Sequence, residues 1–177
     1  MDRPLIGTWM RLLDEAIGEH VSPERSPTGS ETAACILRHV GSTGAGEVWR
    51  RVCAGDDVSP MIDPAAVGPL LPALRDQGIE VWHGAELAAL HALSWNARWA
   101  ARCDAAAAWM LDEVQPDNAT NRPWAIHWFV RMAAMDGGTE AEMYAQTLLH
   151  NARISDGAAD ELGLCLLRDS LSRLRSM

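Results

Sequence analysis

Apolar residues recur along the chain at the three- and four-residue spacing of α-helices. In the first such stretch, residues 4–19, large apolar side chains fall on one face: Leu5, Trp9, Leu12, Leu13 and Ile17. Similar stripes, bounded by glycine, proline or capping residues, predict further helices in residues 30–40, 47–54, 64–78, 84–99, 103–114, 123–137, 139–151 and 158–177. The best strand candidate, residues 79–82, is too short to build a sheet. The pattern therefore predicts an all-α protein.

The order of the predicted helices indicates how the 177 residues are organised as one domain. Residues 1–58 form an N-terminal helical segment. In residues 63–177, six helices with short links predict three successive antiparallel helical hairpins. This organisation resembles that of α/α-toroid and helical-solenoid proteins, in which helix pairs stack with a similar period. The DDxxD and DxDD motifs of terpenoid-cyclase-type toroids do not occur in the sequence, so the resemblance implies a helical arrangement and no activity.

Composition agrees with a helical, globular chain and excludes several kinds of binding and catalytic site. The sequence is 48% hydrophobic and 22% charged, alanine is abundant, and β-branched residues are sparse. The formal net charge is -9 with no basic block, which predicts no nucleic-acid partner. All 15 basic residues are arginine, so neither a Schiff-base lysine for pyridoxal phosphate nor a phosphate-binding loop with lysine is available. We predict no cofactor.

The cysteines and the lack of long apolar runs predict the cellular compartment of the protein. No two of Cys35, Cys53, Cys103 and Cys165 form a CxxC pair, so we expect free thiols in a reducing compartment. The first residues mix charged and apolar side chains, unlike a signal peptide, and no apolar run reaches the roughly 18 residues of a membrane span. We therefore expect a cytoplasmic protein that does not enter a membrane.

Polar residues gather in the links that three antiparallel hairpins would place at one end of the domain: residues 79–84, 116–122 and 152–157. We call the polar residues in or beside these links the polar rim: His83, Asp117, Asn118, Asn121, Arg122, His150 and Asn151. Trp82 and Trp124 flank the rim, while His91 and His127 lie one or two helical turns deeper. A polar mouth above aromatic side chains is the usual form of a small-molecule site.

Each of these residues also has a structural interpretation. Asp117, Asn118 and Asn121 are suited to a turn and a helix N-cap. Buried histidines are often satisfied core residues, and tryptophans fill wide gaps in an alanine-rich core. Glu80 and His83 have the Glu-x-x-His spacing of di-iron bundles, but the motif occurs once, so we predict no metal site.

Two main functional hypotheses follow. The first is a non-catalytic helical module that associates with a protein partner or with itself, with the final helix, residues 158–177, as the candidate contact. The alternative is a small-molecule-binding protein or enzyme that uses the polar rim over a tryptophan-lined pocket, with Trp124 and His127 among its binding residues. A third hypothesis is an accessory domain that works beside a larger enzyme.

Overall fold

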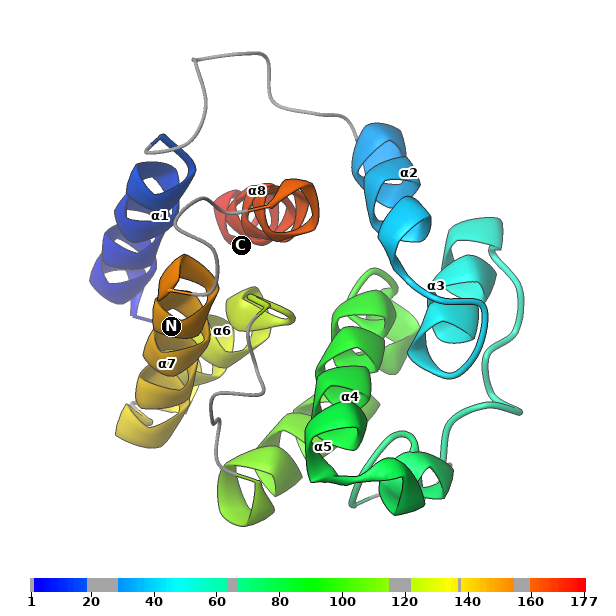
Figure 1. Cartoon of the computed structure of the whole chain (residues 1–177). Helices are drawn as coiled ribbons and strands as arrows, with labels where there is room; N and C mark the ends of the chain where they lie inside the picture. Colours follow the sequence, from blue (N-terminus) through cyan, green and yellow to red (C-terminus); the bar gives the residue numbers. More distant parts are fainter. Residues whose placement is uncertain (1, 19–28, 64–66, 115–121, 137, 155–159) are drawn as a thin grey trace.

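The computed structural model describes residues 2–18, 29–63, 67–114, 122–136, 138–154 and 160–177, which contain helices joined by turns and irregular links, with no strand among them (Figure 1). The α-helices are α1 (Arg3–Gly18), α2 (Gly29–His39), α3 (Ala45–Ala54), α4 (Ile79–Leu93), α5 (Ala100–Glu113), α6 (Ile126–Asp136), α7 (Thr139–Ile154) and α8 (Glu161–Arg175). Two short 3-10 helices are η1 (Pro72–Gln77) and η2 (Ala97–Trp99). The all-α prediction is confirmed. No helix among the described residues combines the length and the apolar character needed to cross a bilayer.

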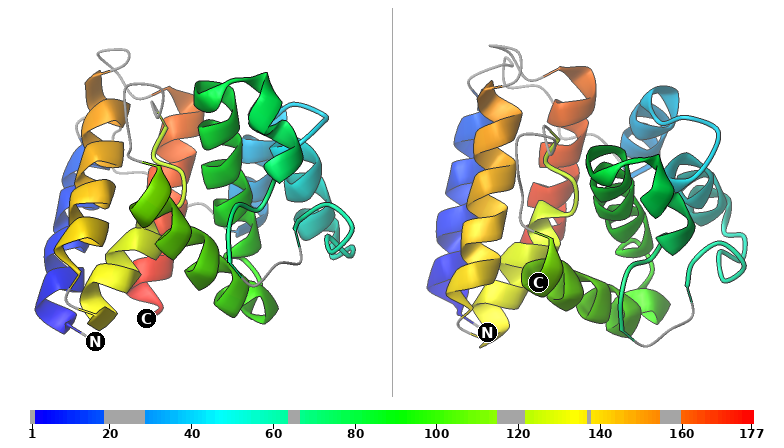
Figure 2. Two further views of the ribbon diagram at one scale, coloured as in Figure 1. Left: turned by 90° about the horizontal axis from the view of Figure 1, so that it is seen from below. Right: turned by 60° about the horizontal axis from the view of Figure 1, so that its bottom comes forward.

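The helices pair in a different order from the predicted hairpins. Consecutive helices α6 and α7 pack closely, although the prediction placed them in separate hairpins, and α3 packs against α4. In the described part of the chain, α8 packs against α1 and α2 from the N-terminal segment rather than along α7. In both views of Figure 2, α8 (red) lies between α1 (blue) and α4 (green). The N-terminal helices are therefore integral to the core. A toroid- or solenoid-like arrangement stays a prediction.

The apolar face of α8 is part of the core. Five of the six leucines of α8 are buried, namely Leu162, Leu166, Leu167, Leu171 and Leu174, and Leu164 is half-buried. Burial of each leucine side chain contributes about 1.5–3 kcal/mol to the stability of the fold. Because these leucines are buried, this face already packs against other parts of the chain. The buried leucines of α8 therefore give no support to the association surface expected at residues 158–177, which stays a prediction.

Residues before α4 depart from the predicted helix. A helix was expected over residues 64–78. Of the residues described there, 67–71 are irregular and only η1 is helical, because Pro69 and Pro72 lack the N–H that an α-helix interior needs. The expected link 79–84 is instead the first part of α4, which begins after Gly78 at φ 98°. The expected helix 84–99 ends early at Leu93, and Asn96 caps η2 by accepting from the Arg98 amide.

Two side chains hold this irregular segment in place. The buried Glu86 carboxylate on α4 accepts hydrogen bonds from the amides of Leu70 (2.7 Å) and Leu71 (2.6 Å). Arg102 on α5 donates to the carbonyls of Asp63, Gly68 and Pro69 at 2.7–3.1 Å. Backbone groups that have no helical partner are thus satisfied by side chains, as buried polar groups require.

A tight turn places α3 beside α4. Gly44 has φ 53°, and a Cβ at Gly46 would lie 1.8 Å from the Gly41 carbonyl oxygen. Only glycine allows the backbone to approach this closely. After this turn, α3 packs against α4, and its Trp49 side chain is buried in the core.

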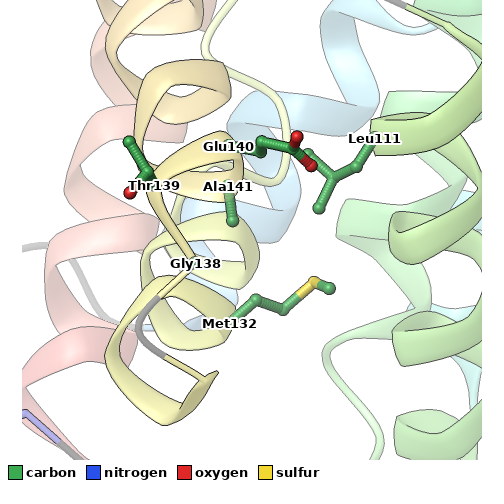
Figure 3. A pocket seen from close by; sticks show the side chains of 6 residues that line it. All are labelled: Leu111, Met132, Gly138, Thr139, Glu140 and Ala141. Carbon is green, nitrogen blue, oxygen red and sulfur yellow. The ribbon is translucent and has the colours of Figure 1, made fainter.

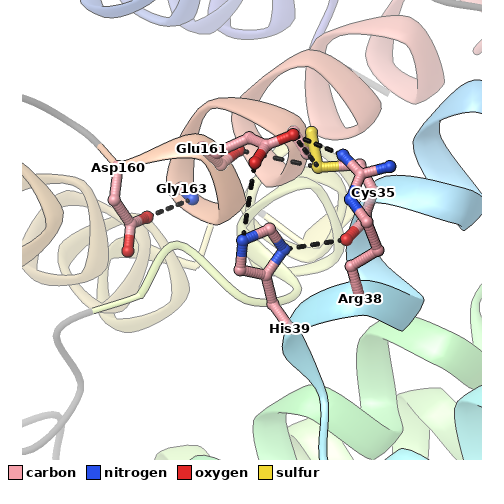
Figure 4. Close-up of a disulfide and its surroundings, with 7 residues drawn as sticks. Cys35, Arg38, His39, Asp160, Glu161 and Gly163 are labelled. Atoms are coloured by element: carbon pink, nitrogen blue, oxygen red, sulfur yellow. Dashed lines mark hydrogen bonds and ion pairs between the residues drawn. A yellow bond between two sulfur atoms is a disulfide. The ribbon is translucent and has the colours of Figure 1, made fainter.

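A disulfide joins α2 to α8 (Figure 4). Cys35 and Cys165 are bonded, with their Cα atoms 6.6 Å apart, while Cys53 and Cys103 are free. Around it, Arg38 and His39 lie against Glu161 in the first turn of α8. The expectation of four free thiols is therefore wrong, because the fold brings together two cysteines that are 130 residues apart in the sequence. The disulfide gives no support for a cytoplasmic location.

We predict that the disulfide contributes strongly to stability. Because it closes a loop of this length in the unfolded chain, the variant Cys35→Ala/Cys165→Ala should lose about 2–4 kcal/mol of unfolding free energy. Cys53→Ala, which removes a free half-buried thiol, is the matched control and should change much less. Urea unfolding with and without a reductant measures both, and a wild-type protein indifferent to reduction would contradict the prediction.

Glu86 should make stability depend on pH in the acid range. Burial raises its pKa above the usual 4.5, although the Leu71 and Leu70 amides oppose the shift. A carboxyl with a raised folded-state pKa binds protons more readily in the folded protein, so its contribution falls as pH rises through and above 4.5. Relative to Glu86→Gln, the wild type should therefore lose unfolding free energy between pH 4 and pH 7. A constant difference across that range would refute this.

Candidate functional site

A buried carboxylate, Asp169 of α8, is the centre of a polar cluster in the described core. Its Oδ2 atom accepts from His91 Nε2 at 2.8 Å and from Trp95 Nε1 at 3.2 Å. Arg173, one turn later on α8, donates to the same oxygen from Nε at 2.6 Å and to the Ser94 carbonyl at 3.2 Å. The cluster therefore connects the end of α4 to α8.

The hydrogen bonds of His91 define its protonation. The Ala125 amide donates to Nδ1 at 3.0 Å, so Nδ1 carries no proton and Nε2 donates to Asp169. The ring is thus the neutral Nε2–H tautomer. Ala125 itself has φ 53°, a conformation that costs a non-glycine residue energy and is held here by the bond to His91.

His127 of α6 lies beside His91, with ring centroids 4.8 Å apart, and has a separate set of partners. The Ser94 hydroxyl donates to the His91 carbonyl (2.6 Å), so it accepts from His127 Nε2 (2.9 Å). His127 Nδ1 then accepts from the Ser170 hydroxyl at 3.3 Å. Both ring nitrogens are satisfied inside the protein, and the ring is neutral.

Burial and charge set the pKa values in this cluster. Burial lowers the pKa of His91, against the opposing effect of Asp169. Burial, together with nearby His91 and Arg173, lowers the pKa of His127 well below its usual range. Burial alone would raise the pKa of Asp169, but the hydrogen bond from His91 and the Arg173 guanidinium outweigh it and lower that pKa.

Tryptophans enclose the cluster on the α3 side. The Trp49 ring lies 5.5 Å from that of His91, 5.3 Å from Trp95 and 6.0 Å from Trp124. Trp49 is fully buried, and its Nε1 atom finds no hydrogen-bond partner among the described residues. The Arg173 guanidinium covers the outer face of Trp95 at 5.0 Å. These contacts fill the space around the histidines with protein atoms.

The cluster has the residue types of a catalytic site without the arrangement of one. A serine nucleophile must give its proton to a histidine, whereas the Ser94 proton is directed to the His91 carbonyl. The group on the far side of His127 is the Ser170 hydroxyl and not a carboxylate that would stabilise a charged ring. The geometry is that of a satisfied core network that joins α4, α6 and α8.

The described residues of the predicted site have different surroundings, although Trp124 and His127 both lie beside His91. His83 is buried, and its Nε2 atom is hydrogen-bonded to the Tyr144 hydroxyl at 2.6 Å. His91 and His127 have other hydrogen-bond partners. Arg122 pairs with Asp160, the N-cap of α8. On α7, His150 is exposed and Asn151 is half-buried, while Trp124 is buried in the tryptophan cluster. The remaining predicted residues, Asp117, Asn118 and Asn121, lie outside the described residues.

Sequence reasoning missed Asp169, Ser170 and Ser94. One signal was available: Asp169 and Ser170 stand between leucines of the apolar face of α8, at positions that helical spacing buries. A polar side chain at a buried position needs a partner elsewhere in the fold. Among the described residues, no group of three or more His, Cys, Asp and Glu side chains is arranged to hold a metal ion.

An apolar pocket lies elsewhere, between α5, α6 and the start of α7 (Figure 3). It has a volume of about 380 Å³, is partly open to solvent, and is lined by Leu111, Met132, Gly138, Thr139, Glu140 and Ala141. In the figure the side chains of Met132 and Glu140 extend from their helices towards α5. None of the residues predicted from the sequence lines it.

The neutral histidines predict an acid-sensitive fold. Because the pKa values of His91 and His127 lie below the 6.5 of an exposed histidine, the unfolded chain binds more protons, and the unfolding free energy should fall as pH drops from 7 towards 5. His127→Gln should reduce this slope, and Gln146→Ala, which changes an exposed side chain that does not titrate, should leave it unchanged. Urea unfolding at several pH values measures the slopes, and equal slopes in all three proteins would contradict the assignment.

No family model, curated protein or solved structure matches the chain. The residues and their geometry are therefore the grounds for any assignment of function.

Proposed function

We propose that the protein is an association module that binds a protein partner by accepting an apolar side chain of that partner into the pocket between α5, α6 and α7. The pocket itself is the observation that carries this proposal. Its volume of about 380 Å³ falls in the range of sites that hold ligands, and Leu111, Met132 and Ala141 give it an apolar lining.

Exposed methionines beside the pocket support a protein contact. Met135 is 51% exposed and lies three residues after Met132 on α6, while Met143 is 60% exposed and lies three residues after Glu140 on α7. Residues at this spacing are neighbours on a helix surface. Methionine side chains are flexible and polarisable, and are frequent at surfaces that bind protein segments.

The buried histidines favour association over catalysis. His91 and His127 are neutral, fully enclosed and hydrogen-bonded within the protein, so they do not need an external ligand to satisfy them. The proposal therefore keeps the association function inferred from the sequence and moves the contact from α8 to the α6–α7 pair.

A labelled peptide tests the pocket directly. The probe is a short amphipathic helical peptide with leucines on one face and glutamines on the other, followed by fluorescence anisotropy. The variant Leu111→Gln/Met132→Gln should bind roughly tenfold more weakly than the wild type, or about 1.4 kcal/mol, because a partner would have to desolvate the amides.

Met177→Gln is the matched control, since Met177 is an exposed methionine that does not line the pocket, and it should leave affinity unchanged. Circular dichroism checks that each variant is folded. The proposal fails if the wild type does not bind the peptide, or if the pocket variant binds it equally well.

A further inference from the structure

Helix α2 has little buried surface of its own to hold it in place. It lies at the edge of the molecule in the view of Figure 1, and it packs against α8 and less extensively against α3. Of its described side chains, those of Thr32, Cys35 and Ile36 are buried, and the others are half-buried or exposed. Elements with few buried apolar contacts are the ones that open locally while the rest of a fold stays intact.

The polar contacts between α2 and α8 lie at the surface. Arg38 pairs with Glu161 in the first turn of α8, and His39 Nε2 is 3.6 Å from the same carboxylate (Figure 4). The Arg38 and Glu161 side chains are both more than half exposed. Exposed ion pairs contribute little to stability, because water and salt screen them. The covalent bond between Cys35 and Cys165 is therefore the main link that keeps α2 on α8.

A surface side chain lies directly against this disulfide. The Glu161 Oε1 atom is 4.0 Å from Cys35 Sγ, and the Glu161 side chain is 59% exposed. The other half of the bond, Cys165, keeps 9% of its surface exposed. A reductant therefore approaches the sulfur atoms from the surface, beside Glu161, and does not have to enter the core.

The turn after α2 is fixed to α3. Arg50 of α3 donates to the Gly41 carbonyl at 3.0 Å and to the Ser42 carbonyl. Trp49 holds α3 itself, because its side chain is fully buried in the core. A Cβ placed on Gly41 would meet no atom within 4 Å, so there is room at this position for the chain to change direction. Helix α2 can therefore leave α8 without moving α3.

We propose that the Cys35–Cys165 disulfide is a redox switch: its reduction by a dithiol releases α2 from α8 and uncovers the face of α8 around Cys165, while the rest of the fold stays in place. A thiolate of the dithiol attacks one of the two sulfur atoms and breaks the S–S bond, and the second thiol of the reagent then resolves the mixed disulfide. The dithiol is oxidised to a disulfide, and Cys35 and Cys165 receive its two electrons and two protons as thiols.

The other contacts of α8 do not involve α2. Helix α8 also packs against α1 and α6, and its Asp169 accepts a hydrogen bond from His91 of α4 at 2.8 Å. These contacts remain when the disulfide is reduced. Leu162 lies three residues before Cys165, so the two are neighbours on the helix surface. We therefore expect the reduced protein to keep its core and to expose apolar surface beside Cys165, so that it presents a different face under reducing and oxidising conditions.

Hydrogen exchange followed by mass spectrometry tests the switch in the full-length protein, with and without dithiothreitol, a small dithiol. Reduction should raise the exchange rate of the α2 amides roughly tenfold or more relative to that of the α4 amides, because α2 then opens locally. The dye ANS, which binds exposed apolar surface, should fluoresce more strongly in the reduced protein. Replacing dithiothreitol by oxidised glutathione should reverse both changes.

Variants assign the effect to the bonded pair. Cys35→Ser/Cys165→Ser should show the fast α2 exchange without dithiothreitol and should not respond to it. Cys53→Ala is the matched control, because it removes a free cysteine and keeps the disulfide, and it should respond to dithiothreitol as the wild type does. If the serine variant does not fold, the wild type with and without dithiothreitol decides the question alone.

Three outcomes would overturn the switch. If α2 and α4 lose protection together, the disulfide stabilises the whole fold and does not control α2. If α2 exchange is unchanged after complete reduction, verified by alkylation of all four cysteines in urea, other contacts hold α2 on α8. If Cys35 and Cys165 of the air-oxidised protein are alkylated in urea before any reductant is added, there is no bond for a dithiol to reduce.

Discussion

Much of the core depends on the hydrogen bonds that the buried Asp169 carboxylate accepts. Removing a carboxylate from water costs several kcal/mol unless hydrogen bonds and opposite charge replace the lost hydration. Here His91 and Trp95 approach from the end of α4, and Arg173 approaches from the same helix, α8. Each donor is held at hydrogen-bonding distance of one oxygen, so α4 and α8 have a single well-satisfied arrangement. An apolar contact of similar area would fix their relative position less strictly, because it has no preferred direction.

The buried polar groups around this carboxylate must also be hydrogen-bonded. His91 can donate to Asp169 only because its other nitrogen accepts from the Ala125 amide, and that bond fixes the turn into α6. His127 is then carried into the core next to His91 and is satisfied by two serine hydroxyls. Before α4, prolines leave backbone groups without helical partners. Glu86 accepts hydrogen bonds from amides there, and Arg102 donates to carbonyls. Most polar side chains of the interior are therefore used to satisfy other buried groups.

The function that we propose uses the surface of the protein and not these interior polar groups. Histidine, serine and aspartate in the interior form the residue set of a catalytic site, but their protons and lone pairs are directed at one another. The pocket between α5, α6 and α7 differs from this cluster, because its lining is mostly apolar and it opens to solvent. An apolar opening of this kind suits the apolar side chain of the partner that we propose.

The sequence by itself determined the helical class and most helix positions, because helical periodicity, alanine content and glycine or proline breaks act over a few residues. It failed where the outcome depends on distant partners. The segment before α4 is irregular because Glu86 and Arg102 satisfy its backbone, and Cys35 meets Cys165 only once α2 packs on α8. Likewise, the sequence could nominate His91 and His127 as special, but only the tertiary structure shows that Asp169, Ser94 and Ser170 satisfy them. Local spacing fixes which face of a helix is apolar, whereas the partner of that face is decided by the packing of the whole chain.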